Sequence, residues 1–189
     1  MIRLFFSIVT ILYFLAVIPV AIFCFSWMNF RIENLPPADI ALHSVIKKTV
    51  EELKRKYQLS LIGTGGSGDD NEITMSSISF ELAHSMSQEE CRKVILDCAQ
   101  LFLKEINSDA QLTPYLSVKP FGYKNIEVLI FMSHPDRSRP LHPSISVVSL
   151  TDGIIKYRTV NPENTYEYKS VVRETYEEAL RKVQSSDNL

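Results

Sequence analysis

The stretch that decides the fold is SISVVSLTDGIIKYRTV, residues 144–160. Two apolar runs rich in β-branched residues flank the segment TDG, residues 151–153. Asp and Gly between such runs are typical of a tight turn, because they tolerate the positive φ angles of a short hairpin loop. The stretch therefore predicts a β-hairpin.

Further strands are expected on the N-terminal side of this hairpin. The run IEVLIFMS, residues 126–133, is mostly apolar, which is typical of a central strand. Earlier in the chain, QLSLIG (58–63) is predicted as a short strand, and apolar and polar residues alternate over 73–82. The alternation changes parity at Ser76-Ser77, where one extra residue, a β-bulge, restores a common buried face.

Three helices are expected beside these strands. The segment SQEE, residues 87–90, is typical of a capping box, in which a serine and a glutamate satisfy each other's backbone N–H groups. The helix that follows extends to about Asn107. Its predicted buried face consists of Cys91, Val94, Ile95, Cys98, Phe102 and Ile106. Two more helices are predicted at 39–57 and 166–184, where apolar residues recur every three or four positions.

The resulting order, α-β-β-α-β-β-β-α, predicts an α+β fold. Because short hairpin links join the strands in both halves, we expect an antiparallel sheet with helices packed on it. We expect residues 39–185 to form one domain, preceded by a linker at 32–38 and followed by a disordered tail at 186–189. Cys91 and Cys98 are seven positions apart on one helix, about 10.5 Å, which predicts buried thiols rather than a disulfide.

Residues 1–31 differ from the rest of the chain and are predicted to be an N-terminal membrane anchor. No charged residue occurs between positions 4 and 30. As a helix this run reaches roughly 40 Å, enough to cross a hydrocarbon core of about 30 Å. The run is longer than a cleavable signal peptide and lacks its small-residue cleavage pattern. The sequence thus predicts an uncleaved, single-pass signal anchor in the lipid bilayer.

The sequence predicts the membrane span more strongly than the side of the membrane on which the domain lies. Arg3 makes the short leader basic, while Arg31 follows the span at once, so positive charge is nearly balanced across it. A basic leader before an apolar run begins an export signal, which favours an extracytoplasmic domain. The chain carries 20 Lys and Arg against 22 Asp and Glu, and this mild acidity argues against nucleic acid as a partner.

The glycine-rich run GTGGSGDDN, residues 63–71, raises the question of a phosphate-binding loop. Such a loop needs a lysine and a hydroxyl after its glycines, and then the N-terminus of a helix. Here aspartates and an alternating strand follow, so no nucleotide and no cofactor is expected. We interpret the run as a flexible hairpin loop, with Gly65, Gly66 and Gly68 as a candidate partner-binding loop.

The loop HPDRSRPLHP, residues 134–143, is the strongest polar constellation. Its candidate site residues are His134, Asp136, Arg137, Arg139 and His142. The two arginines are suited to an anion or a partner, and the histidines with the aspartate are potential metal ligands, although two arginines oppose a cation. The plainer interpretation, a solvated loop shaped by prolines, is favoured because no nucleophile or helical scaffold accompanies it. No catalytic residue and no metal site are assigned.

Aromatic residues gather in YLSVKPFGY, residues 115–123. Tyr115, Phe121 and Tyr123 are predicted to form a lid over the end of the sheet, with a partner-binding patch as the alternative. The run PYLSVKPFGYKNIEVLIF, taken with LIGTGG before it, resembles uncharacterised single-pass bacterial membrane proteins, a group without an assigned activity. The resemblance implies no functional residue.

The sequence therefore predicts a membrane-tethered, non-catalytic interaction or accessory domain of the bacterial envelope, with an unidentified protein partner. The alternative is a membrane-anchored hydrolase or anion-binding enzyme that uses the loop from His134 to His142.

Overall fold

A computed structural model describes residues 36–69 and 72–186 of the chain. Its elements are α2 (Pro37–Tyr57), β1 (Ser60–Asp69), β2 (Glu72–Leu82), α3 (Gln88–Ser108), the 3-10 helix η1 (Thr113–Tyr115), β3 (Ile126–Met132), β4 (Val147–Thr151), β5 (Ile154–Val160), β6 (Tyr168–Thr175) and α4 (Tyr176–Ser186). The described part of the chain thus has an α+β fold with three α-helices and a six-stranded sheet, which confirms the predicted class.

The strands lie in the sheet in chain order, from β1 at one edge to β6 at the other. Neighbouring strands are antiparallel except β2 and β3, which are parallel. The predicted purely antiparallel sheet is therefore wrong. Parallel neighbours need a crossover connection, and α3 provides it by returning the chain from the end of β2 to the start of β3.

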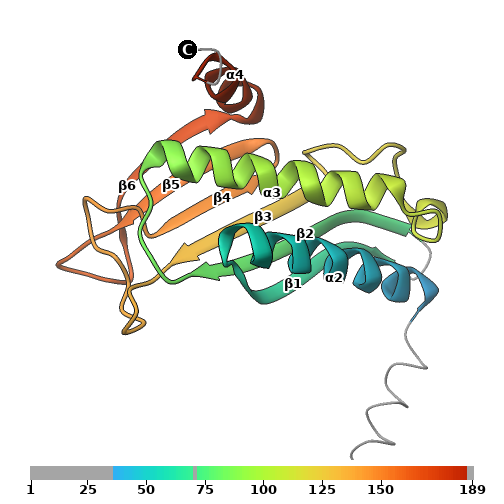
Figure 1. Cartoon of the computed structure of the whole chain (residues 1–189), viewed down its shortest axis with the longest axis horizontal. Helices are drawn as coiled ribbons and strands as arrows, with labels where there is room; N and C mark the ends of the chain where they lie inside the picture. Colours follow the sequence, from blue (N-terminus) through green and yellow to red (C-terminus); the bar gives the residue numbers. More distant parts are fainter. Residues whose placement is uncertain (1–35, 70–71, 187–189) are drawn as a thin grey trace, which may run out of the picture.

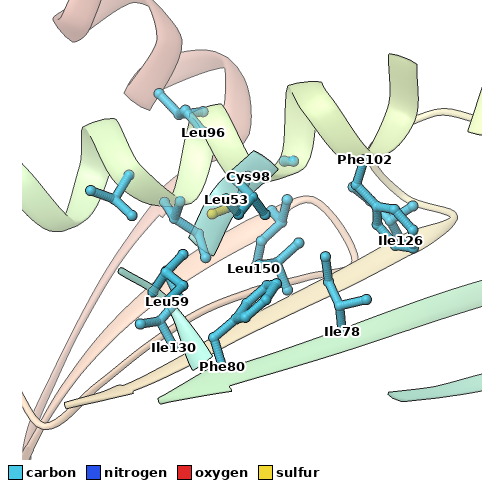
Figure 2. Close-up of a cluster of buried hydrophobic side chains, with 14 of the residues drawn as sticks. Leu53, Leu59, Ile78, Phe80, Leu96, Cys98, Phe102, Ile126, Ile130 and Leu150 are labelled. Carbon is cyan, nitrogen blue, oxygen red and sulfur yellow. The ribbon is translucent and has the colours of Figure 1, made fainter. Parts of the chain in front are cut away.

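The helices form one layer over one face of the sheet (Figure 1). Burial alternates along β3, where Ile126, Val128 and Ile130 face the helices and are fully buried. Leu129 and Phe131 lie on the opposite face and are only half-buried. Figure 2 shows that side chains of α2 and α3 meet those of β2, β3 and β4 in one continuous core.

Two local predictions are confirmed in detail. At the start of α3, the backbone N–H of Glu90 donates to Ser87 Oγ (3.2 Å) and that of Ser87 donates to Glu90 Oε2 (2.8 Å). In the turn between β4 and β5, Asp152 and Gly153 take φ angles of 49° and 73°, as a two-residue hairpin loop requires. Local chemistry determines both features.

The predicted C-terminal helix at 166–184 is wrong over its first half. Residues 168–175 form β6, which pairs antiparallel with β5, and α4 begins only at Tyr176. The segment YKSVVRET contains valines and a threonine, which suit a strand as well as a helix face. Pairing with the exposed edge of β5 therefore decides its structure, and the sheet gains a sixth strand.

The start of the domain also needs a small correction. Helix α2 begins at Pro37 rather than Asp39, within the predicted linker 32–38, because proline suits the first position of a helix. Within residues 36–69 and 72–186, no helix has the length and apolar character needed to cross a bilayer. The predicted span, residues 4–30, lies outside the described residues, as does most of the predicted tail.

Replacing Phe80, a fully buried residue of β2, with alanine is expected to destabilise the fold strongly. The cavity and the lost burial should lower the free energy of unfolding by about 3–5 kcal/mol, measured by urea denaturation of the full chain in mild detergent. Tyr166→Ala is the control, since Tyr166 is 98% exposed. Equal effects of the two changes would contradict the assigned core.

Candidate functional site

The glycine run forms most of strand β1 and is not the flexible loop that was predicted. Strand β1 extends from Ser60 to Asp69 and pairs with β2 through the glycines, with Gly65 opposite Ser77 and Gly66 opposite Ser76. The pairing of β1 with β2 extends to Asp69 opposite Glu72. The hairpin itself is confirmed, and the segment after the glycines is a strand, as predicted.

Three glycines of β1 lie where a Cβ atom would come very close to β2, and at Gly66 and Gly68 the close atom belongs to the backbone. A Cβ atom on Gly65 would lie 2.8 Å from Ser77 Oγ, and one on Gly66 would lie 2.9 Å from the backbone oxygen of Met75. Gly68 adopts a φ angle of 146°, and its Cβ would lie 2.0 Å from the backbone oxygen of Glu72. These residues thus have a structural role in pairing the two strands.

The predicted bulge is present, but it lies closer to the turn than Ser76-Ser77. The register shifts between Ser67 and Gly68, which leaves Thr74 without a partner in the ladder. Its hydroxyl donates instead to the backbone oxygen of Ser67 (2.9 Å). As the parity argument requires, the shift lets Ile73 and Ile78 both be buried on the helix side.

Strand β1 is an edge strand without the usual protection. Edge strands are commonly blocked by lysine or proline, because their outer N–H and C=O groups have no ladder partner. Residues 60–69 contain no lysine, arginine or proline, and Leu61 and Ile62 are 40% and 54% exposed. The opposite edge, β6, carries Lys169 and Arg173. The two edges therefore differ in how readily they accept another strand.

A groove of about 450 Å³ separates β1 from the N-terminal half of α2. It is lined by Asp39, Leu42, His43, Ile46, Thr64, Gly65, Gly66, Ser67, Gly68, Asp69, Glu72, Ile73 and Met75. Thr64, Gly66 and Gly68 pair with residues whose side chains are buried beneath the helices, so these three share the helix-facing side of β1. Two of the three are glycines, which leaves the space beside α2 unfilled.

The loop that contains the predicted polar site lies at the surface. His134, Asp136, Arg137, Arg139 and His142 are all exposed. The carboxylate of Asp136 accepts hydrogen bonds from the backbone N–H and the hydroxyl of Ser138, which lower the pKa of that carboxyl. Asp136 thus shapes its own loop.

Of these five residues, His142 lines a pocket with a volume of about 380 Å³. Its Nδ1 atom lies 3.0 Å from Thr159 Oγ1, which lies 2.9 Å from Ser170 Oγ. The helix start at Ser87 forms another wall. Apart from His142, the described residues that line this pocket include no acidic or basic side chain. A histidine beside a hydroxyl can act as a base, but no lining carboxylate orients it.

The predicted aromatic lid packs mainly against the domain itself. Phe121 is 3% exposed, and Asn107 holds its backbone N–H and C=O at 2.8 and 3.0 Å. Tyr123 stacks on Tyr176 with ring centroids 4.7 Å apart, and Tyr115 is half-buried. This segment therefore joins α3, η1 and α4 and offers little free aromatic surface.

The most strongly paired charges form a structural cluster at the junction of α3, β6 and α4. The Glu174 carboxylate, 4% exposed, accepts hydrogen bonds from Arg92 Nε (2.7 Å), the Tyr157 hydroxyl (2.5 Å) and Lys182 Nζ (2.6 Å). Burial alone would raise the pKa of Glu174, but these three donors outweigh it and lower the pKa. The cluster fixes β6 and α4 to the rest of the domain.

The predicted buried thiols are confirmed. Cys91 and Cys98 are free and fully buried, and burial raises the pKa of Cys91 to about 12 and that of Cys98 further. Both side chains therefore stay protonated and act as small apolar groups. Within the described part of the chain, no three His, Cys, Asp or Glu side chains are grouped so as to hold a metal ion.

Comparisons of the chain with protein-family models, with curated proteins and with solved structures found no match. The geometry of the described residues is therefore the basis for a functional proposal. Among the predicted site residues, Gly65, Gly66 and Gly68 lie together at one groove, while the residues of the 134–142 loop do not line it. The contribution of α2 to this groove was not predicted from the sequence.

The lowered pKa of Glu174 makes one pH dependence testable. Its stabilisation is complete above the unfolded carboxyl pKa of about 4.3 and is lost as the pH falls through the folded value. Glu174→Gln should lower the free energy of unfolding by about 3 kcal/mol at pH 7, with a smaller difference at acidic pH. Urea denaturation across the pH range measures this difference, with Glu163→Gln on an exposed loop as the control. A difference that does not change with pH would contradict the assignment.

Proposed function

We propose that this protein is a membrane-tethered, non-catalytic interaction domain that binds an extended segment of a partner protein along the free edge of β1. The observation that carries the proposal is the unprotected ten-residue edge strand with an open groove beside it. A partner strand that pairs with β1 satisfies the outer backbone groups of β1 and extends the sheet. Its alternate side chains then enter the groove beside α2.

The exposure of β1 supports this function over a purely structural role. The glycines explain how β1 pairs with β2, but they do not explain why its outer edge lacks a blocking residue. Leu61 and Ile62 expose apolar surface at the same edge. An exposed apolar edge strand favours aggregation unless another segment covers it. A partner bound along β1 would therefore explain why apolar residues are exposed at this edge.

The membrane tether is proposed from the sequence of residues 4–30. Only six residues, 31–36, separate the predicted span from α2, and an extended chain of that length reaches at most about 20 Å. Asp39 and Leu42, in the first turns of α2, belong to the groove. We therefore place the binding site close to the bilayer surface, on the extracytoplasmic side, where it meets partners in or near the envelope membrane.

The alternative, a hydrolase or anion-binding enzyme that uses the 134–142 loop, has weaker support. His142 lines a pocket, where its Nδ1 atom is hydrogen-bonded to Thr159, which is hydrogen-bonded in turn to Ser170. Arg137 and Arg139, which were proposed to clamp an anion, are exposed and are not among the residues that line this pocket. The loop is better suited to a solvated connection between β3 and β4.

A photo-crosslinking amino acid at Leu61 is expected to form an adduct of defined mass in cells that express the full chain. The change Ile62→Lys should remove this adduct, because lysine on an edge opposes strand pairing. Val172→Lys is the matched control, since Val172 is 46% exposed on the opposite edge and Ile62 is 54% exposed. Gel analysis with mass spectrometry measures the adducts.

Equal adduct yields from the Ile62→Lys and Val172→Lys variants would contradict strand addition at β1. Absence of any adduct from Leu61, with an active crosslinker and a folded chain, would contradict an interaction at this edge. An adduct with twice the mass of the chain would identify a second copy as the occupant.

The full chain is expected to sediment with membranes and to remain there after alkaline carbonate extraction, because residues 4–30 supply enough apolar surface for stable insertion. A chain that starts at Ile32 should lose this membrane association. Immunoblotting of the membrane and soluble fractions measures it. Release of the full chain by carbonate would contradict the tether.

A further inference from the structure

We infer, on the basis of the proposed function, that the groove selects a partner strand carrying lysine or arginine next to an apolar residue on the same face. Asp39, Asp69 and Glu72 contribute carboxylates to the lining, and His43 is its one histidine. No lysine or arginine is found among the described residues that line the groove. The lining therefore combines an apolar wall with an excess of negative charge.

The carboxylates lie at one end of the groove. Helix α2 ends at Tyr57 and β1 begins at Ser60, so the short connection makes the two elements run in opposite directions. The first turn of α2, with Asp39, is thus at the same end as Asp69, the last residue of β1, and Glu72, the first residue of β2. Asp69 also accepts the backbone N–H of Glu72 (2.9 Å).

The apolar wall continues inward from this acidic end. Leu42 is half-buried, while Ile46 and Ile73 are each 6% exposed and form part of the core. In an added strand, side chains on one face recur every second residue, about 6.6 Å apart. A basic side chain and an apolar side chain two positions apart therefore match the acidic end and the neighbouring wall.

The shape of the groove disfavours a second copy of the chain as its occupant. On the helix-facing side, a second β1 strand would present Thr64, Gly66 and Gly68. These residues have little or no side chain, so they would leave the groove of each copy largely empty. A segment from a different protein, with longer side chains at alternate positions, fills the space and can place a cationic group near the acidic end of the groove.

Peptide binding to the full chain in mild detergent tests this inference. The probes are fluorescently labelled peptides of about eight residues that alternate valine and threonine, with Lys, Gln or Glu at one central valine position. Fluorescence anisotropy at low salt should show that the Lys peptide binds about threefold more tightly than the Gln peptide and about tenfold more tightly than the Glu peptide. This preference should shrink at about 0.5 M salt.

Two sets of variants separate charge selection from strand addition. Asp39→Asn combined with Glu72→Gln should abolish the preference for the Lys peptide over the Gln and Glu peptides. Glu51→Gln, an exposed acidic position on α2 outside the groove, is the matched control and should retain the preference. Ile62→Lys should weaken binding of all three peptides, whereas Val172→Lys should leave it unchanged.

The outcomes distinguish the inference from the proposed function. If the three peptides bind equally and Ile62→Lys weakens them all, the charge selection is wrong and strand addition at β1 remains. If no peptide binds, or if Ile62→Lys has no effect, both are wrong. If sedimentation shows a dimer that Ile62→Lys dissociates and no peptide competes with it, a second copy occupies the edge and the inference is overturned.

Discussion

The parallel pairing of β2 with β3 is the constraint on which the rest of the fold depends. It requires a crossover, and α3 provides one by packing Phe102 and the rest of its buried face against one side of the sheet. Helices α2 and α4 pack on the same side (Figure 1). The hairpin then leaves β1 at the border of the sheet, beside α2. Because Gly66 and Gly68 lie on the helix-facing side of β1, the space beside α2 stays open as the groove.

Sequence was sufficient where neighbouring residues determine the structure. The turn at 151–153 and the capping box at 87–90 were predicted because their hydrogen bonds and backbone angles are local. Residues 168–175 were predicted as a helix because their spacing suits either element, and only the exposed edge of β5 decides between them. The direction of β3 relative to β2 was also missed, since it depends on how α3 crosses the sheet.

The candidate site was predicted in part. The strand that follows the glycine run was predicted and is confirmed, but the pairing of the run itself along β2 was hidden because glycine has low strand propensity. The groove joins residues from α2 with residues from β1 and β2, so no single motif contains it. In contrast, the 134–142 loop was predicted as a candidate site because of its density of charged residues, and these side chains are exposed to solvent. The predicted span at 4–30 stays a prediction.

The central claim is that one edge of the sheet is open for another strand, and amide hydrogen exchange along β1 tests it most directly. Strand β1 has a ladder partner on one side only, whereas β3 is paired on both sides. In the purified full chain, about half of the β1 amides should therefore exchange rapidly while the β3 amides remain protected. Protection of all β1 amides to the level of β3 would mean that the edge is already covered, which contradicts the account.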